Sequence, residues 1–319
     1  MSASQPERPR ILFMGTPEFA VPCLRALAHA GYSLPAVVTQ PDRKRGRGRK
    51  LSPSPVKKAA LELGLEVIQP EDAADDSFCQ VITGQQPHVI VVVAFGQILC
   101  SSFLDIPGAG VLNIHSSLLP KYRGAAPIQW AVINDETETG LSAMLLDEGM
   151  DTGPVLLQQR IPIGTRDTAG TVHDRLAAIS GDFLIRALDG LFDGSLRPEP
   201  QDESLASYAP KIDRNIACID WKSGANEISA LIRGLDPFPG ASTTFEGKRL
   251  KLFMPSALKV QGEGPVPGRV CGVRADCLEI ETGSGILVVR ELQIEGKKRM
   301  PAEEFLRGCS IRTGMLLGE

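Results

Sequence analysis

The sequence predicts an α/β protein with a second, smaller β domain, on three observations. Short apolar runs alternate with amphipathic stretches over roughly the first 190 residues. From Ala241 onward, five short strand-like runs follow one another, separated by turn residues. A chain of 319 residues is also long enough to form two cores. The first pattern predicts a Rossmann-like, mainly parallel, doubly wound N-terminal domain, and the second predicts a small C-terminal β-barrel.

The N-terminal region opens with a predicted strand over residues 10–14, a glycine turn and a helix to about residue 30. Gly15 stands alone in that turn, so the G-x-G-x-x-G set that binds a dinucleotide pyrophosphate is missing, and nicotinamide binding is disfavoured. The run PHVIVVVAF at 87–95 needs cover on both faces because it is continuously apolar. Other strands are expected over residues 34–40, 65–69, 113–115, 141–146 and 154–163, and helices over 54–64, 72–83 and 165–191.

Composition argues against metal and membrane classes. The seven cysteines are odd in number and scattered without a C-x-x-C pair, which disfavours a disulfide framework or a zinc site and indicates a reducing compartment. With four histidines, no metal is expected. The start lacks an apolar signal region, and the longest apolar run is too short to span a bilayer. We therefore expect a cytoplasmic protein that does not enter a membrane. Two domains without a large apolar surplus predict a monomer.

The charge is unevenly distributed along the chain. The net charge is -4, yet residues 207–319 hold 16 Lys and Arg against 14 Asp and Glu, so this part is +2 and the remainder is -6. This mild asymmetry permits contact between RNA and the C-terminal part without requiring it.

Two polar side chains mark a candidate site in the middle of the chain. Alternation along a strand places Asn113 and His115 on one face. The strand should stop before Pro120, which has no N–H to donate, so the pair lies near a carboxyl end, where open α/β sheets bind ligands. The Gly-rich loop DEGMDTG then brings Asp147 and Asp151, and a loop carboxylate can fold back toward the histidine.

Asn, His and Asp together suit acyl-type transfer. An Asn amide can donate to a developing oxyanion, a His can supply a proton or positive charge, and a carboxylate can hold the imidazole. No protein nucleophile is needed if the substrate brings an amine. The alternative is structural, with Asn113 capping a turn, His115 satisfied in the core and Asp151 solvated in its loop.

A basic stretch follows the second predicted strand. Six of the eight residues from Arg43 to Lys50 are Lys or Arg, broken by two glycines, which predicts a mobile cationic loop. Since it leaves the carboxyl end of a strand, it should lie on the same rim as Asn113 and His115 and could grip phosphates. A solvated surface loop or an import-like basic patch would have the same composition.

The segments NIHSSLLPKYRGAAPIQW and DEGMDTGPVL resemble the folate-dependent formyltransferases, and among them the members that act on methionyl-tRNA. The resemblance extends over GTPEFAVPCL, TQPDRKRGRGRKLSPSPVK, VVVAFGQIL, YAPKI, IDW and PFPGA, and so covers nearly the whole chain. It implies that 10-formyltetrahydrofolate is the formyl donor, that initiator methionyl-tRNA is the acceptor, and that Asn113, His115 and Asp151 are catalytic. It also implies an OB-fold-like C-terminal barrel. The absence of a transit peptide predicts a bacterial source rather than an organelle.

The resemblance also assigns binding roles. The expected folate-binding residues are Phe95, Gly96, Ser117, Leu118, Leu119, Pro120 and Asp147. The expected tRNA contacts are Arg47 first, with Arg43 and Arg49 as helpers, and Lys211 near the domain junction. The expected domains are 1–190 (catalytic), 191–207 (linker, rich in Pro, Asp, Glu and Ser) and 208–319 (tRNA-binding).

Three alternatives stay open. The same catalytic domain could formylate a small amine, such as a sugar nucleotide or ribonucleotide, or hydrolyse the folate donor. A nicotinamide oxidoreductase would share the fold class, although the glycine fingerprint is missing. A non-catalytic RNA-binding module is the third, and the presence of all three catalytic candidates argues against it.

Overall fold

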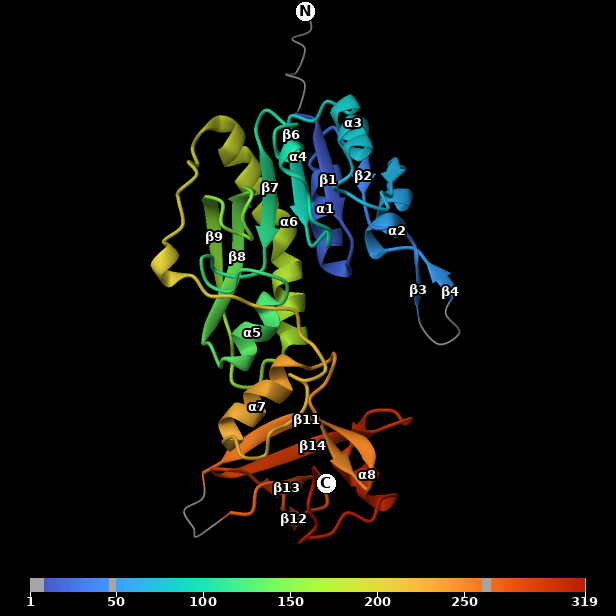
Figure 1. Cartoon of the computed structure of the whole chain (residues 1–319), viewed down its shortest axis with the longest axis vertical. Coiled ribbons are helices and arrows are strands. Elements are labelled where there is room, and N and C mark those ends of the chain that lie inside the picture. The colour runs from blue at the N-terminus through green and yellow to red at the C-terminus, as the bar shows by residue number, and fades with distance from the viewer. Residues whose placement is uncertain (1–8, 46–49, 260–264, 319) are drawn as a thin grey trace, which may run out of the picture. The chain divides into compact units, whose positions relative to one another are not determined.

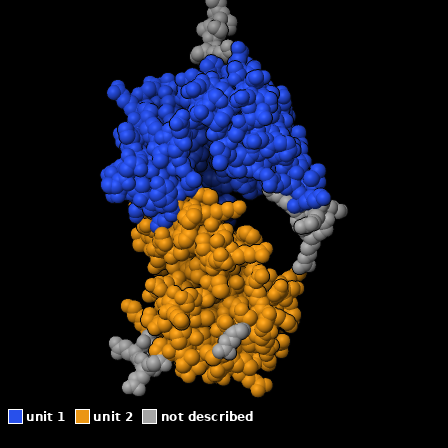
Figure 2. Space-filling view, viewed as in Figure 1, with its two compact units in different colours: residues 1–124, 140–161, 173–208 blue, residues 125–139, 162–172, 209–319 orange. Residues whose placement is uncertain are grey.

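The structure is a computed structural model that describes residues 9–45, 50–259 and 265–318 (Figure 1). It forms two compact units, coloured separately in Figure 2. Unit 1 comprises residues 1–124, 140–161 and 173–208, and unit 2 comprises 125–139, 162–172 and 209–319. The predicted fold class is confirmed, with a mainly parallel sheet in the first half of the chain and an antiparallel sheet in the second.

A seven-stranded sheet has the order β5-β2-β1-β6-β7-β8-β9. The strands β5, β2, β1, β6 and β7 pair in parallel, and β8 pairs with β7 in the antiparallel direction. The strands are β1 (Ile11–Gly15), β2 (Val37–Val38), β5 (Val67–Ile68), β6 (Val89–Val93), β7 (Val111–His115), β8 (Glu138–Leu145) and β9 (Val155–Pro162).

Helices cover both faces of the central strands. Leu12 and Ile90 pack in one core cluster with Phe78 of α3 (Asp76–Gly84) and Phe103 of α4 (Ser101–Leu104). The alternate residues of β1 and β6, such as Phe13, are fully buried as well, so the opposite face is also covered. The remaining helices of this half are η1 (Glu18–Ala20), α1 (Val21–His29), α2 (Pro55–Glu62), α6 (Ala169–Asp193) and η2 (Glu203–Leu205).

Unit 2 is built on an antiparallel sheet of order β10-β11-β14-β13-β12, with β15 paired to β14. Its core gathers Trp221, Phe245 and Phe305 with aliphatic side chains of the sheet. The elements are α5 (Pro127–Ile133), α7 (Ala225–Gly234), β10 (Ser242–Phe245), β11 (Lys248–Leu258), β12 (Val270–Val273), β13 (Leu278–Glu281), β14 (Ile286–Ile294), β15 (Met300–Pro301) and α8 (Ala302–Arg307). The five strand-like runs of the sequence thus become five of these strands.

The basic stretch differs from the expected loop. Its two flanks form a small antiparallel hairpin of β3 (Arg43–Arg45) and β4 (Lys50–Ser52), and residues 46–49 lie outside the described residues. The hairpin is possible because a two-stranded ladder uses backbone groups and does not require an apolar face. Ser54 then caps α2, its Oγ accepting from the Lys57 amide at 3.0 Å.

Candidate active site

The strand β7 carries the first two candidate residues. All five of its residues are buried, and Asn113 and His115, 9% and 7% exposed, share one face. Asn113 pairs in register with Val92 of β6 and with Met144 of β8. Within the part of the chain that the structure describes, no hydrogen bond occupies the Asn113 side-chain amide. Its donors are therefore free for a ligand.

Both ring nitrogens of His115 have neighbours. The Nε2 atom lies 2.9 Å from the carbonyl oxygen of Tyr122, and because a carbonyl only accepts, Nε2 carries the proton of this hydrogen bond. The Nδ1 atom lies 3.7 Å from Oδ2 of Asp151, which is close enough for an ion pair and too long for a hydrogen bond. The loop carboxylate therefore folds back toward the histidine, as the sequence predicted.

Asp151 is held in place by the backbone around it. Its Oδ2 accepts a 2.8 Å hydrogen bond from the Gly124 amide, and its own φ is +55°, a left-handed conformation that Asp and Asn tolerate better than most residues. Gln201 donates to the carbonyls of Asp151 and Gly153 at 2.8 and 2.7 Å. A Cβ at Gly153 would lie 1.9 Å from the Leu145 carbonyl oxygen, so this position requires glycine.

Asp147, expected to bind folate, organises the same loop. Its Oδ1 accepts from the Gly149 amide at 3.0 Å and from the Thr152 hydroxyl at 2.7 Å, and its side chain is exposed. These bonds define the course of the loop that leads to Asp151.

The segment Ser117–Pro120 is fixed from β8 and β9. The Ser142 hydroxyl donates to the Ser117 carbonyl at 2.7 Å and accepts from the Leu119 amide at 3.0 Å, while Gln158 donates to the Leu119 carbonyl at 2.8 Å. The Leu119–Pro120 peptide is cis. Ser117 and Leu119 are buried, and Leu118 and Pro120 are half-buried. Within this segment, Leu118 and Pro120 therefore have apolar surface that a ligand can contact.

The chain leaves β6 through Phe95 and Gly96. The Phe95 ring is 2% exposed and packs in the core cluster, so a ligand would meet this residue only through its backbone. Gln40 donates from Nε2 to the carbonyls of both residues at 2.9 Å. Gly96 has a φ of +82°, and a Cβ there would lie 2.7 Å from the same Gln40 nitrogen. Both observations disfavour a side chain at position 96, so a ligand can approach the backbone closely here.

Sequence reasoning missed Arg123, a fully buried side chain within the motif PKYRGAA. Its guanidinium donates to Glu203 at 2.8 and 2.7 Å and to the Gln201 side-chain oxygen at 3.1 and 2.9 Å. The Glu203 hydrogen bond raises the pKa of Arg123, and the arginine lowers the pKa of Glu203. Since Gln201 also holds the Asp151 loop, Arg123 supports the site indirectly.

The 199–208 segment, defined by Glu199 to Tyr208, is bonded to the rest of unit 1 along its length. Glu199 exchanges two backbone hydrogen bonds with Val155, at 2.8 and 2.9 Å. The Ser207 carbonyl accepts from the Arg123 amide at 2.8 Å, and the Ser207 hydroxyl accepts from the Tyr122 amide at 2.9 Å. The backbone that accepts from His115 is therefore positioned by residues more than eighty positions later.

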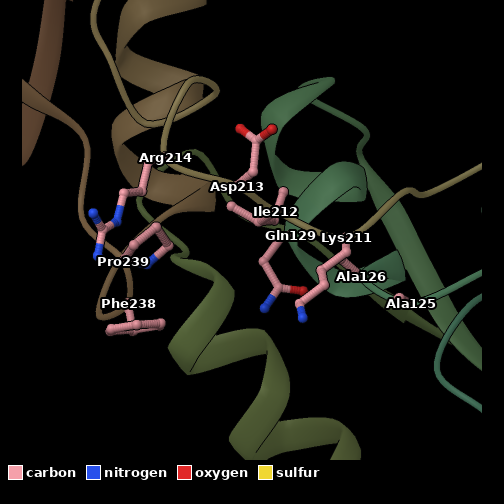
Figure 3. A pocket seen from close by; sticks show the side chains of 9 residues that line it. All are labelled: Ala125, Ala126, Gln129, Lys211, Ile212, Asp213, Arg214, Phe238 and Pro239. Atoms are coloured by element: carbon pink, nitrogen blue, oxygen red, sulfur yellow. The ribbon is translucent and has the colours of Figure 1, made fainter. Parts of the chain in front are cut away.

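The expected tRNA contacts fall in different places. Arg43 is exposed on β3, whereas Arg47 and Arg49 lie outside the described residues. Lys211 is exposed in unit 2 and lines a pocket of about 310 Å³ (Figure 3). In the view of Figure 3 the side chains of Lys211 and Gln129 extend in the same direction, and Asp213 points the other way. Phe238, also in the wall, is 79% exposed and was not singled out from the sequence.

Within residues 9–45, 50–259 and 265–318, no cluster of three or more His, Cys, Asp or Glu side chains is arranged to hold a metal ion. None of the helices in these ranges has the length and apolar character needed to cross a membrane.

Comparison with known proteins identifies the family. The profile described as "Formyl transferase" matches residues 9–188, and that described as "Formyl transferase, C-terminal domain" matches residues 211–310. The chain belongs to the formyl transferase family. This family member is 47% identical over 308 residues to the methionyl-tRNA formyltransferase of Pelobacter propionicus, covering 97% of this chain and 96% of that one. It is 48% identical over 309 residues to the protein of the same name from Caldanaerobacter subterraneus subsp. tengcongensis, covering 97% and 99%.

Solved structures share the fold of this formyltransferase. The sugar 3N-formyl transferase WlaRD, solved with dTDP and 5-N-formyl-THF, matches with a TM-score of 0.64 at 18% identity over 91% of this chain and 99% of that one. HypX from Aquifex aeolicus in complex with tetrahydrofolic acid matches with a TM-score of 0.61 at 19% identity over 94% of this chain. The chain spans about half the length of HypX, 47% in that structure.

Proposed function

We propose that this formyltransferase moves a formyl group from 10-formyltetrahydrofolate to the α-amine of methionine on initiator methionyl-tRNA. The observation that carries the proposal is the arrangement of Asn113, His115 and Asp151 at the end of β7, in a chain whose relatives named methionyl-tRNA formyltransferase match 97% of its length at 47% identity. The relatives are bacterial. A bacterial cytoplasmic location and a monomeric state remain predictions.

The donor side of the site fits a folate. Gly96, three residues beyond the end of β6, leaves a backbone edge without a side chain, and Asn113 on the adjoining β7 has an unoccupied amide. Leu118 and Pro120 add partly exposed apolar surface. A flat apolar slot with a few polar groups at one end suits a pterin ring. Folate derivatives in the related HypX and WlaRD structures support this choice of donor.

Each catalytic candidate has a role in the transfer. The methionine amine attacks the formyl carbon, a new C–N bond forms, and the bond from that carbon to N10 of the donor breaks. Negative charge develops on the formyl oxygen, and the free amide of Asn113 can donate to it. The amine loses a proton and N10 gains one, so the reaction is balanced without a further reactant.

His115 can act through Nδ1. Its Nε2 is committed to the Tyr122 carbonyl, whereas Nδ1 is 3.7 Å from Asp151, beyond hydrogen-bond reach. A protonated Nδ1 can therefore donate to a reacting group while the carboxylate stabilises its charge. Asp151 orients the ring and can receive the amine proton through water.

The acceptor side is supported by cationic and aromatic surface. The hairpin β3–β4 carries Arg43, while Arg47 and Arg49 belong to the stretch 46–49, which lies outside the described residues. In unit 2, Lys211 offers a charge for phosphate, and the exposed ring of Phe238 in the same pocket offers a face on which a base can stack. A small amine would need neither feature, which favours tRNA over a sugar nucleotide.

The proposal is tested by formyl incorporation into charged initiator methionyl-tRNA, with a small free amine as competing acceptor. Asn113→Ala and His115→Ala should each lower turnover by about 10²–10³-fold, the usual loss for one transition-state donor. His29→Ala, an exposed histidine at the end of α1, is the matched control and should not change the rate. Near-normal turnover in either site variant would refute the catalytic assignment. Formylation of the small amine alone would refute the proposal that methionyl-tRNA is the acceptor.

The acceptor surfaces have their own test. Phe238→Ala should raise the KM for methionyl-tRNA by roughly 5–150-fold and leave kcat nearly unchanged, since loss of one stacked base costs about 1–3 kcal/mol. Phe238→Trp should restore binding. Arg47→Ala should weaken tRNA use without affecting a small amine. An unchanged KM in Phe238→Ala would show that the pocket does not contact the tRNA.

A further inference from the structure

Two cysteines that the proposed reaction does not use meet at one edge of unit 1. Cys79 lies in α3, and Cys100 is the residue that precedes α4. They are 21 positions apart in the sequence, yet their Sγ atoms are 3.2 Å from each other. Both side chains are half-buried, so a small reagent can reach them while the surrounding structure holds them.

The packing around the pair keeps the sulfurs together. Phe78, the neighbour of Cys79, stacks on Phe103 of α4 with ring centroids 5.8 Å apart and planes within 5°. Both rings belong to one core cluster, and both cysteines pack against it. A disulfide requires the Sγ atoms to approach to about 2.05 Å. The remaining approach is short enough for side-chain rotation and a small shift of the segment before α4.

The two thiols differ in reactivity because of Ser102. Its hydroxyl lies 3.1 Å from the Cys100 sulfur and 3.9 Å from the Cys79 sulfur. The hydrogen bond from Ser102, followed by that from Cys79, lowers the pKa of Cys100. Burial, followed by the hydrogen bond to Cys100, raises the pKa of Cys79. Cys100 is thus the thiol that ionises first, and Cys79 is the neighbour that holds its proton.

We propose that Cys79 and Cys100 form a redox-active dithiol that is oxidised to an intramolecular disulfide by low-molecular-weight disulfides. The Cys100 thiolate attacks one sulfur of the reagent, forming a mixed disulfide and releasing one thiolate. Cys79 then loses its proton and attacks the Cys100 sulfur, and the second reagent thiolate leaves. Two protein thiols are oxidised to one disulfide, and one reagent disulfide is reduced to two thiols.

The experiment treats the reduced full-length protein with oxidised glutathione and follows intact mass and non-reducing peptide maps. In the wild type the Cys79 and Cys100 peptides become linked, the chain loses the mass of two hydrogen atoms, and dithiothreitol reverses both changes. Cys79→Ser stops the reaction at a glutathione adduct on Cys100. Cys100→Ser leaves Cys79 as a free thiol.

Two other cysteines serve as internal references. Cys218→Ser, at an exposed cysteine, should leave the linkage unchanged. Cys23 is fully buried and should remain unmodified. Equal unfolding temperatures of the reduced variants would show that serine is tolerated.

The proposal is overturned if Cys218 acquires glutathione while the Cys79 and Cys100 peptides stay unlinked, or if the wild type accumulates a stable glutathione adduct on Cys100. An adduct on Cys79 in Cys100→Ser would overturn the assigned order of attack. These outcomes do not depend on formyl transfer, so they leave the proposed function untouched.

Discussion

Asp151 combines two properties that substitution can separate. Its carboxylate faces His115 and accepts from the Gly124 amide through the same oxygen, Oδ2, and its backbone has a φ of +55°. Asp151→Asn keeps the shape, can still accept from Gly124, and tolerates a left-handed backbone, but it removes the negative charge. Asp151→Ala removes both the acceptor and the tolerance for positive φ.

The two variants should therefore differ in stability more than in activity. In Asp151→Ala, the left-handed conformation costs about 1–2 kcal/mol and the lost hydrogen bond to a charged group about 1.5–3 kcal/mol, so the free energy of unfolding should fall by about 2.5–5 kcal/mol. Asp151→Asn should lose well under half of that. Both variants should lower turnover by about 10²–10⁴-fold, because the histidine has lost its charged partner.

The assay pairs urea unfolding, followed by circular dichroism, with steady-state formyl transfer. Hydrogen exchange of the peptide that contains Gly124 reports the local bond directly, and its amide should exchange faster in Asp151→Ala than in Asp151→Asn. An Asp151→Asn enzyme with near wild-type turnover would refute the role of the charge. Equal stability of the two variants would refute the argument from Gly124 and the positive φ.

Three further predictions follow from groups outside the site. Arg269 donates to Glu281 and lowers the pKa of that carboxyl from its ordinary value, so Glu281→Gln should destabilise unit 2 at neutral pH, and the difference should disappear as the pH falls through the lowered pKa. Tryptophan fluorescence measures this because Trp130 and Trp221 both lie in unit 2, and a difference independent of pH would contradict it. Arg233 donates to Asp135 at 2.5 Å and to the Asp167 carbonyl at 3.2 Å, so Arg233→Met should lower the free energy of unfolding of unit 2 by about 1.5–3 kcal/mol in the same assay, with the exposed Arg307→Met as a neutral control. Burial raises the pKa of Cys23 to about 12, so iodoacetamide at neutral pH should label Cys23 only after unfolding, and labelling of the native protein as fast as that of Cys218 would show otherwise.

Much of the fold could be predicted because the pattern of apolar and polar residues within a short stretch indicates which positions are buried. The run of β6 is short and made of β-branched residues, which favours a buried strand over a helix, and the run of β14 is one of the five strand-like runs that turn residues separate. The lengths of the strands were harder to predict from the sequence. The predicted strand at 34–40 is reduced to Val37–Val38, since its length is set by the pairing with β1 and β5.

Only those parts of the site that a local motif or a residue spacing indicates could be predicted. Asn113 and His115 share a face by alternation, and the glycines of DEGMDTG allow the loop to return to them. The burial of Arg123 depends on Gln201 and Glu203, about eighty positions away. The residues next to Arg123 in the sequence do not indicate that it has these partners.

Positive charge in the sequence also did not show which side chains are available to bind phosphate. Arg299, a cation of the C-terminal half, is paired with Asp236 and Glu291 and packs over the Phe253 ring at 4.0 Å. Lys251 on β11 donates to the Pro239 carbonyl at 2.6 Å, and burial lowers its pKa. A sequence shows how many cations are present but does not show which ones are already engaged.

The 199–208 segment bears on how such a chain can be recombined during evolution or in the laboratory. The N-terminal family profile ends at residue 188, before this segment, yet Gln201, Glu203 and Ser207 hold Arg123, the Asp151 loop and the backbone beside His115. A chimera joined at residue 188 would combine one parent's catalytic residues with another parent's supports. A junction after Tyr208 would inherit both from the same parent, so functional hybrids should cluster at the later crossover.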